Sequence, residues 1–476
     1  MRILLAIPPD VHHLEIYRVA KMNAPPLGLA WIAAVLERAG HKVKILDSPT
    51  LRLTLDRFLR EVKSWKPDLV GLSLLTPLAP KGYKAIKALK EECGEIPVVA
   101  GGIHPTFMYE EALDHGADVV VRGEGEYTSL ELVEVIEKRG LDEEALRKVR
   151  GIAFRSRSGE TVVTEPRPFI ENLDDLPWPA RHLLPMDRYT LLGKPIRVAH
   201  VMAGRGCPYG CSYCTTSYFW GRRLRLRSAR SVAEEIEHVV DEYKAEYVVF
   251  ADDELTVSKK FVRELLGELK SRGLDLQFAC GSRVDHLDRE LLKSLIDSGC
   301  VCLYLGVESA SQATLDKIGK RITVEQAVRA FRMIRELGGF AVGSFILGFP
   351  WETVEDMKRT IEFAVKLDPD YAQFTALTPY PGTPLFDFAS ENGLIVDWNW
   401  EHYTTLRPVM KGFCFTVEML GRMLKYAYRK FYLRLGFVWR EMRSGRLVDL
   451  IGILAGEIVK MLKEVVRGER ERKKAR

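Results

Sequence analysis

Short apolar runs alternate with amphipathic helical stretches along most of this 476-residue chain, and this alternation restricts the fold more than any other feature. In the first part of the chain, five runs are predicted to be strands: residues 3–7, 43–46, 69–74, 98–100 and 119–121. Four stretches between them have helical spacing: residues 29–39, 55–64, 81–92 and 108–115. Strict alternation of strand and helix produces a parallel, doubly wound sheet. We therefore predict an α/β domain over residues 1–135, with a ligand site at the carboxyl ends of its strands.

The alternation resumes at residue 195. Six further strands are predicted, at residues 196–202, 247–251, 276–280, 301–307, 341–347 and 371–377. Six strand–helix units in a row predict a partial (β/α)6 barrel over residues 195–414, whose active site would lie at the carboxyl ends of the strands. Residues 136–194 contain a run rich in turn formers and prolines, and are predicted to be a linker between the two domains.

The positive charge of the chain is concentrated at its C-terminal end. From Gly421 onward sixteen Lys or Arg stand against six Asp or Glu, although the whole chain has a net charge of only +5. Residues 415–476 are predicted to be a basic helical segment. It either lies on an anionic membrane surface or caps the barrel and ends in a solvated tail. No stretch reaches the roughly 18 to 20 apolar residues of a membrane span, and the N-terminus lacks a signal-peptide pattern, so we expect a cytoplasmic protein. Peripheral association with the inner membrane face is left open.

Three of the eight cysteines lie within eight positions. Cys207, Cys211 and Cys214 have the spacing C-x3-C-x2-C and follow the first predicted barrel strand. Thiolates are soft ligands that suit iron–sulfur clusters or zinc. Structural zinc takes four protein ligands, whereas three cysteines leave one iron of a 4Fe-4S cluster open to a chelating ligand. The spacing therefore favours an iron–sulfur cluster, with zinc as the rival.

This cysteine loop resembles the signature of the radical S-adenosylmethionine superfamily. The resemblance implies that a 4Fe-4S cluster reductively cleaves S-adenosylmethionine to methionine and a 5'-deoxyadenosyl radical, which abstracts hydrogen from an unactivated carbon. It also implies a one-electron donor such as ferredoxin or flavodoxin. Six residues are expected to hold S-adenosylmethionine: Tyr213, Asp253, Glu254, Glu308, Ser344 and Gly348. By this resemblance Tyr213 packs on the adenine, Asp253 or Glu254 binds the methionine amino group, and Glu308 contacts the ribose. Ser344 and Gly348 belong to the fifth-strand motif beside the adenine.

The first domain resembles the cobalamin-binding domain found in such enzymes. The matching segments are Pro25-Pro26-Leu27-Gly28, Ser73-Leu74-Leu75-Thr76, residues 101–106 and Gly123-Glu124-Gly125-Glu126. The expected cobalamin contacts are Ser73, Thr76, Gly101, Gly102, His104, Gly123 and Glu126. The two adjacent glycines would let the backbone approach a flat macrocycle, and the two hydroxyls would bind its nucleotide tail. The loop Asp47-Ser48-Pro49-Thr50 has no histidine where many cobalamin mutases supply the lower cobalt ligand. Cobalamin would therefore bind without a protein histidine on cobalt, unless the domain has lost it.

Three functions are weighed. The first is a cobalamin-dependent radical enzyme that methylates an unactivated carbon, or forms a C–C bond or ring, in a small molecule or an isoprenoid membrane lipid. The second is a methylthiotransferase acting on transfer RNA. Such enzymes normally carry three further cysteines in the first domain, which here has only Cys93, so no nucleic-acid partner is expected. The third, a non-catalytic cobalamin-binding or light-sensing module, would not need the cysteine loop.

The remaining cysteines of the barrel region raise the question of a second cluster. These are Cys280, Cys300, Cys302 and Cys414. Thiols in apolar strands usually serve packing, so we predict no second cluster. The sequence identifies neither the substrate nor a catalytic side chain beyond the cofactor contacts.

Overall fold

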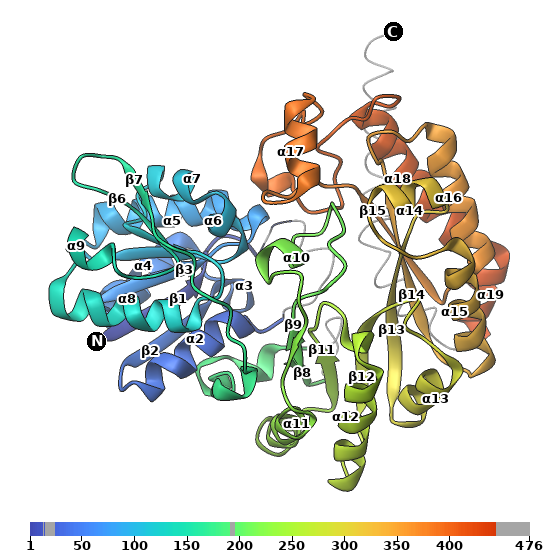
Figure 1. Ribbon diagram of the computed structural model, residues 1–476, viewed down its shortest axis with the longest axis horizontal. Coiled ribbons are helices and arrows are strands. Elements are labelled where there is room, and N and C mark those ends of the chain that lie inside the picture. The colour runs from blue at the N-terminus through green and yellow to red at the C-terminus, as the bar shows by residue number, and fades with distance from the viewer. Residues whose placement is uncertain (13, 15–23, 191–195, 444–476) are drawn as a thin grey trace.

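The computed structural model describes residues 1–12, 14, 24–190 and 196–443 (Figure 1). Its first sheet has seven strands in the order β2-β1-β3-β4-β5-β6-β7. In chain order the strands are β1 (Arg2–Ile7), β2 (Lys42–Asp47), β3 (Leu69–Ser73), β4 (Val98–Gly101), β5 (Val119–Val121), β6 (Ile152–Arg155) and β7 (Thr161–Val163). The first five strands are parallel, as the alternation of strand and helix predicts.

Helices cover both faces of this first sheet. One face carries α2 (Leu27–Arg38) and α8 (Glu126–Arg139), and the other carries α4 (Leu55–Trp65), α5 (Ala79–Glu92), α6 (Ile103–Phe107) and α7 (Tyr109–Asp114). Strand β1 divides its side chains accordingly: Ile3 and Leu5 pack on the α2 and α8 side, and Leu4 and Ala6 on the other side. Strand residues alternate between the two faces, so this strand, which is apolar from Ile3 to Ile7, is buried on both sides. The predicted doubly wound domain is confirmed.

Part of the predicted linker 136–194 is sheet rather than connector. Strand β6 pairs antiparallel with β5, and β7 pairs antiparallel with β6, so the first sheet continues to Val163. A short helix, α9 (Glu143–Leu146), precedes them, and 3-10 turns follow at Leu173–Asp175, Arg181–Leu183 and Met186–Arg188. Strands of three or four residues are too short for their periodicity to be read from sequence, and their pairing is not local. The prediction missed them for that reason.

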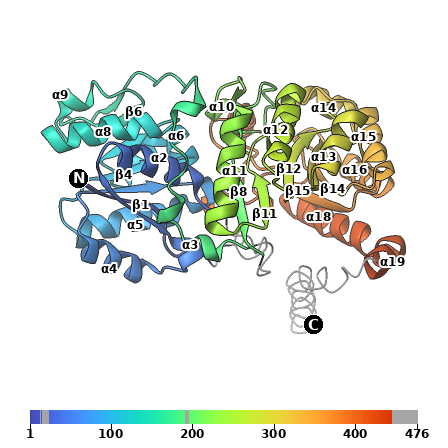
Figure 2. The ribbon, with the colours of Figure 1, turned by 90° about the horizontal axis from the view of Figure 1, so that it is seen from below.

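The second sheet has six parallel strands in the order β15-β14-β13-β12-β11-β8. In chain order they are β8 (Val198–Val201), β11 (Tyr247–Phe250), β12 (Gln277–Arg283), β13 (Cys300–Glu308), β14 (Ala341–Leu347) and β15 (Tyr371–Ala376). The helices that follow the strands are α11 (Ala229–Tyr243), α12 (Lys259–Ser271), α13 (Arg289–Asp297), α14 (Gln312–Lys317), α15 (Val324–Glu336) and α16 (Val354–Leu367). The predicted partial (β/α)6 barrel is confirmed, and its β8 edge lies toward the first domain in Figures 1 and 2.

The other edge of the barrel, β15, is covered by a C-terminal helix, α18 (Val417–Tyr432). Two tyrosines one helical turn apart make both hydrogen bonds that a neighbouring strand would make. Tyr432 accepts from the Ala372 amide at 3.1 Å and donates to the Ala372 carbonyl at 2.7 Å, and Tyr428 does the same to Phe374 at 3.4 and 3.0 Å. An uncovered strand edge is a template for aggregation, and here tyrosine hydroxyls and a helix cover it.

The last described elements are α17 (Pro384–Glu391), a 3-10 turn at Trp400–His402, and α19 (Leu435–Arg443). The helical character predicted for the C-terminal segment is therefore confirmed as far as Arg443. The rest of this predicted segment, residues 444–476, lies outside the described residues. Among the helices that the structure describes, none is long and apolar enough to cross a membrane.

Replacing Tyr432 by Phe should lower the free energy of unfolding by about 1–3 kcal/mol, because the amide and carbonyl of Ala372 then lose their buried partner. Urea unfolding followed by far-UV circular dichroism measures this change. Tyr426 lies on the outward face of the same helix and serves as the matched control, since Tyr426→Phe should change stability by less than about 0.5 kcal/mol. Equal effects of the two variants would contradict the role given to the Tyr432 hydroxyl.

Candidate functional site

The three cysteines lie on a loop that is fixed at both ends. A two-stranded ribbon, β9 (Gly204–Arg205) and β10 (Arg225–Leu226), brackets the loop and the short helix α10 (Thr216–Phe219). Gly206 has φ +89°, and a Cβ there would lie 2.3 Å from the Arg223 carbonyl oxygen, so only glycine fits. Inside the loop, the Ser217 hydroxyl accepts from the Gly210 amide at 3.2 Å and donates to the Cys207 carbonyl at 3.1 Å. The chain's own hydrogen bonds and the Gly206 backbone therefore hold the loop conformation.

The thiols fit a cationic cluster. Cys211 is buried, Cys207 and Cys214 are half-buried, and all three are free thiols. Burial raises the pKa of the Cys207 thiol to about 11, with a smaller contribution from the other two cysteines, and burial also raises the pKa of Cys211 and Cys214. Three grouped thiols that resist ionisation are stabilised as thiolates by bound iron. Among the described residues no three His, Cys, Asp or Glu side chains form a site for a single metal ion. In a 4Fe-4S cluster each thiolate binds a different iron.

Two cations lie beside the cysteine loop, and sequence reasoning missed both. Lys320 and Arg283 each lower the pKa of Cys211, partly offsetting the effect of burial. Lys320 also binds the Glu308 carboxylate with an Nζ–Oε1 distance of 2.6 Å, and the Arg283 guanidinium lies 3.5 Å from the centre of the Tyr209 ring. Arg283 is the last residue of β12 and Lys320 lies in the loop after α14, both far along the chain, so no local pattern links them to the cysteines.

The three acidic residues after β11, Asp252, Asp253 and Glu254, have different roles. Asp252 accepts the amides of Ala203 and Gly204 at 3.0 and 2.6 Å, and so holds the start of the cysteine loop. Asp253 accepts from the Thr216 hydroxyl at 2.8 Å, beside Cys214. Glu254 is buried and already accepts from the Thr256 amide at 3.1 Å, with His286 Nδ1 also at 3.1 Å. Of the two residues predicted for the methionine amino group, Asp253 contacts the cysteine loop directly through Thr216, whereas Glu254 reaches Tyr209 of this loop through His286.

The residues predicted for the adenosine end gather at the ends of β13 and β14. Glu308 ends β13 with a left-handed φ of 68°, and the Tyr213 phenol lies against its carboxylate. Burial and this carboxylate raise the pKa of Tyr213 well above its usual value. The Tyr213 ring packs edge-on against Phe349, with 6.3 Å between the ring centres. Ser344 lies on β14 opposite Gly306 of β13. Tyr213, Glu308 and the fifth-strand motif are thus in one neighbourhood.

A buried carboxyl also fixes the loop after β14. Glu352 accepts the amides of Gly348 and Phe349, both at 3.1 Å, and burial raises its pKa to about 7. Gly348 has φ +93°, and a Cβ there would lie 2.6 Å from the Leu420 side chain of α18. The predicted Gly348 is therefore required by the packing of the C-terminal helix as well as by its backbone conformation.

Five of the predicted cobalamin contacts lie at one edge of the first sheet. Ser73 ends β3, Gly101 ends β4 beside it, and Thr76 is buried in the next turn, Thr76–Leu78. Gly102 has φ +96°, and a Cβ there would lie 3.0 Å from the Leu74 carbonyl oxygen and 3.1 Å from the Ser73 hydroxyl. Gly123 follows β5 and donates its amide to Thr106 at 3.0 Å. At the end of β2, the Ser48 hydroxyl is buried without a hydrogen-bond partner among the described residues. This edge fits a ligand that combines flat and polar surfaces.

Two predicted cobalamin contacts are placed differently. His104 is fully buried; its ring packs edge-on against Trp400 at 5.1 Å, and Nε2 lies 3.7 Å from Glu111. The structure gives it a packing role between α6 and the turn Trp400–His402. The Glu126 carboxylate pairs with Arg205, with an Nη2–Oε1 distance of 2.5 Å. A loop carboxylate or histidine can face a ligand or another segment, and the sequence alone does not distinguish the two.

The partners of Glu126 form a buried ion cluster between the two domains, also missed from sequence. Glu124 accepts from Arg205 at 2.8 Å and from Arg225 at 2.8 and 2.9 Å. All four side chains are buried. The sequence features that could have indicated this cluster are the two glutamates of residues 123–126 and the arginine-rich stretch 222–227. The paired residues are about eighty or more positions apart in the sequence, so no local pattern shows the pairing.

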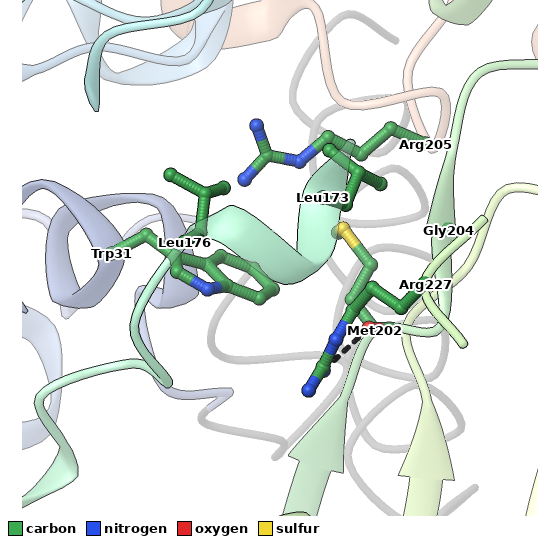
Figure 3. Close-up of a pocket in the computed structure, with 7 residues that line it drawn as sticks. All are labelled: Trp31, Leu173, Leu176, Met202, Gly204, Arg205 and Arg227. Atoms are coloured by element: carbon green, nitrogen blue, oxygen red, sulfur yellow. Dashed lines mark hydrogen bonds between the residues drawn. The ribbon is translucent and has the colours of Figure 1, made fainter. Parts of the chain in front are cut away.

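A small pocket also lies at this junction (Figure 3). Its lining residues are Trp31, Leu173, Leu176, Met202, Gly204, Arg205 and Arg227. Arg227 donates to the Met202 carbonyl at 3.2 Å. None of the residues predicted to hold a cofactor lines this pocket. One lining residue, Arg205, pairs with Glu126, which was predicted to contact cobalamin. We therefore assign it to the domain junction rather than to the cofactor sites.

Comparison with known proteins identifies the class. Residues 201–364 match the model of the radical SAM superfamily, and residues 16–133 match the model of the B12 binding domain. An uncharacterized methyltransferase of Pyrococcus horikoshii is 40% identical over 436 residues, which cover 91% of this chain and 93% of that protein. The anaerobic magnesium-protoporphyrin IX monomethyl ester cyclase of Rubrivivax gelatinosus is 33% identical, over 87% and 75% of the two chains. The hopanoid C-3 methylase of Methylococcus capsulatus is 28% identical, over 80% and 71%.

Two solved structures share the fold. The cobalamin-dependent S-adenosylmethionine radical enzyme OxsB aligns with a TM-score of 0.74 and 17% identity, over 89% of this chain and 66% of that chain. The radical S-adenosylmethionine methyltransferase TsrM of Kitasatospora setae aligns with a TM-score of 0.68 and 21% identity, over 82% and 75%. Both comparisons support the arrangement of a B12-binding domain followed by a radical SAM domain.

The chain belongs to the radical SAM superfamily and carries a B12 binding domain. It is an enzyme of the class whose cofactors are a 4Fe-4S cluster, S-adenosylmethionine and cobalamin, as predicted. Its relatives are methyltransferases and cyclases that act on carbon, and the transfer RNA methylthiotransferase alternative is not favoured. An enzyme of this class needs a reductant and a small-molecule substrate.

The carboxyl of Glu352 predicts a pH dependence of stability. Its pKa is about 7 in the folded chain against 4.5 for the free side chain, so the folded chain binds this proton more tightly. The stabilising contribution is complete below pH 4.5 and is lost as the pH rises to 7. In Glu352→Gln the free energy of unfolding should therefore fall less over this range than in the parent, with a difference of about 3 kcal/mol. Urea unfolding from pH 4.5 to 8 measures it. The exposed Glu355→Gln is the control, and a parallel fall in all three proteins would contradict the prediction.

Proposed function

We propose that this enzyme transfers a methyl group to an unactivated carbon, or forms a C–C bond there, at the junction between its two domains. The observation that carries this proposal is the contact between the two loops predicted to hold cofactors. The loop after β5 pairs with Arg205, which lies two residues before Cys207. Both loops lie at the carboxyl ends of parallel strands, where ligands of such sheets bind. When bound, the cluster and S-adenosylmethionine supply the radical, and cobalamin supplies a methyl carrier.

The protein's own residues bind and orient these groups. We propose that Cys207, Cys211 and Cys214 hold the cluster, and that Asp253 rather than Glu254 binds the methionine amino group, because Glu254 is already engaged by Thr256 and His286. The adenosine end of S-adenosylmethionine is assigned to Tyr213, Glu308, Ser344 and Gly348. Cobalamin is assigned to Ser73, Thr76, Gly101, Gly102 and Gly123.

Anaerobic reconstitution with iron, sulfide and cobalamin tests the reaction class. After addition of S-adenosylmethionine and titanium(III) citrate, the enzyme should form both 5'-deoxyadenosine and S-adenosylhomocysteine, measured by liquid chromatography and mass spectrometry. Absence of a cluster would contradict the whole proposal. Formation of 5'-deoxyadenosine alone, without bound cobalamin or S-adenosylhomocysteine, would contradict methyl transfer and leave radical cleavage.

Replacing Cys207, Cys211 and Cys214 together by Ala should abolish the bound iron and reduce 5'-deoxyadenosine by at least about 100-fold, because the cluster then has no ligands. Iron and sulfide analysis and the absorbance of the reconstituted chain measure this. Cys302 of β13 is the matched control: it is a half-buried thiol outside the loop. If Cys302→Ala also lost iron, a second cluster would exist, contrary to our prediction.

We propose further that the substrate is a lipid and that the enzyme works in the cytoplasm at the inner membrane face. The hopanoid methylase relative acts on a lipid by its name, which supports an apolar substrate. The outward face of α18 supports contact with an anionic surface. Its inward residues Leu420 and Leu424 pack on the barrel, whereas its exposed stripe at helical spacing is basic: Arg422, Lys425, Arg429 and Lys430.

The next helix adds an apolar element to this basic stripe. Leu435, Trp439 and Met442 recur at spacings of four and three on α19, so they share one face, and all three are exposed. The Arg443 guanidinium lies 4.3 Å from the centre of the Trp439 ring. Exposed tryptophan and leucine beside arginine are typical of helices that lie in the interface of an anionic bilayer.

Sedimentation with vesicles tests this surface. The full chain should bind vesicles of phosphatidylglycerol at least about 10-fold more tightly than vesicles of phosphatidylcholine, because about 1 kcal/mol is gained per basic residue near an anionic surface. Trp439→Ala should weaken that binding several-fold. Trp398 is the matched control, since it is 53% exposed against 55% for Trp439 but packs against Phe386 of α17 and Trp400. Equal binding to both vesicle types would contradict the proposal.

A further inference from the structure

We propose that Arg205 and Glu126, with Arg225 and Glu124, form a junction clamp that positions the cysteine loop against the cobalamin-binding edge of the first sheet. These are positioning residues, and their role is to keep the methyl group of S-adenosylmethionine within reach of cobalamin. The inference rests on the proposed function, because it assigns a geometric requirement to the same two cofactor sites. It also gives Glu126 a role different from the cobalamin contact predicted from sequence.

The clamp joins the loop after β5, at the predicted cobalamin site, to the β9–β10 ribbon that holds the cysteine loop. Glu124 and Glu126 follow β5 and flank the turn into α8, next to Gly123. Arg205 is in β9, two residues before Cys207, and Arg225 is its direct partner in β10. The clamp therefore connects the two loops by side chains alone, without an intervening element. A shift of the first domain relative to the barrel would move Arg205 and, through the backbone, Cys207.

The geometry of Arg205 allows one orientation. Its two terminal nitrogens donate to different carboxylates, Glu124 at 2.8 Å and Glu126 at 2.5 Å. Its guanidinium lies 5.0 Å from the centre of the Trp31 ring on α2 and 5.1 Å from the centre of the Trp220 ring. Figure 3 shows the Arg205 side chain extending toward Trp31 across the junction. The side chain is only 3% exposed. A planar guanidinium that donates to two carboxylates and packs near two aromatic rings is fixed in direction as well as in place.

The second arginine completes the hydrogen bonding of Glu124. Arg225 Nη1 donates to both oxygens of this carboxylate and to the Ile170 carbonyl at 2.8 Å, while the Ile170 amide donates to the carboxylate at 2.8 Å. The cluster thus balances two positive against two negative charges and recruits the segment between the domains. Ion pairs buried this deeply add little net stability compared with apolar packing, because desolvation offsets their attraction. Their directional geometry fixes the register between two surfaces, which apolar packing does less well.

The test separates positioning from general stability. The reconstituted enzyme, with cobalamin bound, is given S-adenosylmethionine and titanium(III) citrate without further substrate. S-adenosylhomocysteine requires the methyl group to reach cobalamin across the junction, whereas 5'-deoxyadenosine requires only the barrel and its cluster. In Glu126→Gln the ratio of S-adenosylhomocysteine to 5'-deoxyadenosine should fall at least 10-fold. Arg205→Lys keeps the positive charge but loses the second terminal nitrogen that binds the other carboxylate, so it should lower the ratio as well.

The matched control is another buried ion cluster that does not join the two cofactor loops. Glu235 of α11 is fully buried and pairs with Arg181 and Arg227, so Glu235→Gln removes the same charge from a similar environment. It should leave the ratio within 2-fold of the parent. An unchanged ratio in Glu126→Gln, or an equal fall in Glu235→Gln, would overturn the clamp.

Amide hydrogen exchange provides a readout that does not depend on turnover. In Glu126→Gln, peptides covering residues 201–215 should exchange at least 5-fold faster than in the parent, and in Glu235→Gln the increase should be smaller. Unchanged exchange of these peptides would overturn the clamp even if the parent made no S-adenosylhomocysteine. Absence of S-adenosylhomocysteine in the parent would instead overturn methyl transfer as the proposed function.

Discussion

The buried pairing of Arg205 with Glu124 and Glu126 connects the two halves of this molecule at the place where both carry their predicted cofactor loops. In each half the predicted cofactor loops follow parallel strands, and parallel strands offer their loops for binding at one end only. Two such ends can cooperate only if their relative position is fixed. Here hydrogen-bonded charges fix it, and a second contact, from Trp400 to Glu111 at 2.9 Å, ties the segment after the barrel to the first domain.

Inside the barrel, buried carboxyls hold the loops that follow the strands. Asp252 binds two amides at the start of the cysteine loop, and Glu352 binds two amides after β14. Burial raises the pKa of both carboxyls to about 7. The chain's own carboxyls therefore hold the shape of these loops. At the far edge, α18 closes the sheet and presses Leu420 against Gly348, so the C-terminal helix supports the same loop.

The sequence predicted the elements whose signal is local. All eleven expected strands of the two sheets are present, and the three cysteines lie on one loop, because periodicity and spacing act over a few residues. Contacts whose partner is distant in the sequence were not predicted. Glu126 pairs with Arg205, His104 packs on Trp400, and β6 pairs with β5. The same limit explains why Lys320 and Arg283 were missed beside Cys211.

The central claim is that cluster and cobalamin occupy the two facing loops and lie close together. Electron paramagnetic resonance of the enzyme holding cob(II)alamin, recorded with the cluster oxidised and then reduced, tests it most directly. Two unpaired electrons on neighbouring centres couple magnetically, so the cob(II)alamin signal should broaden or split when the cluster is reduced and should recover on reoxidation. Identical cob(II)alamin spectra in both cluster states would contradict the account.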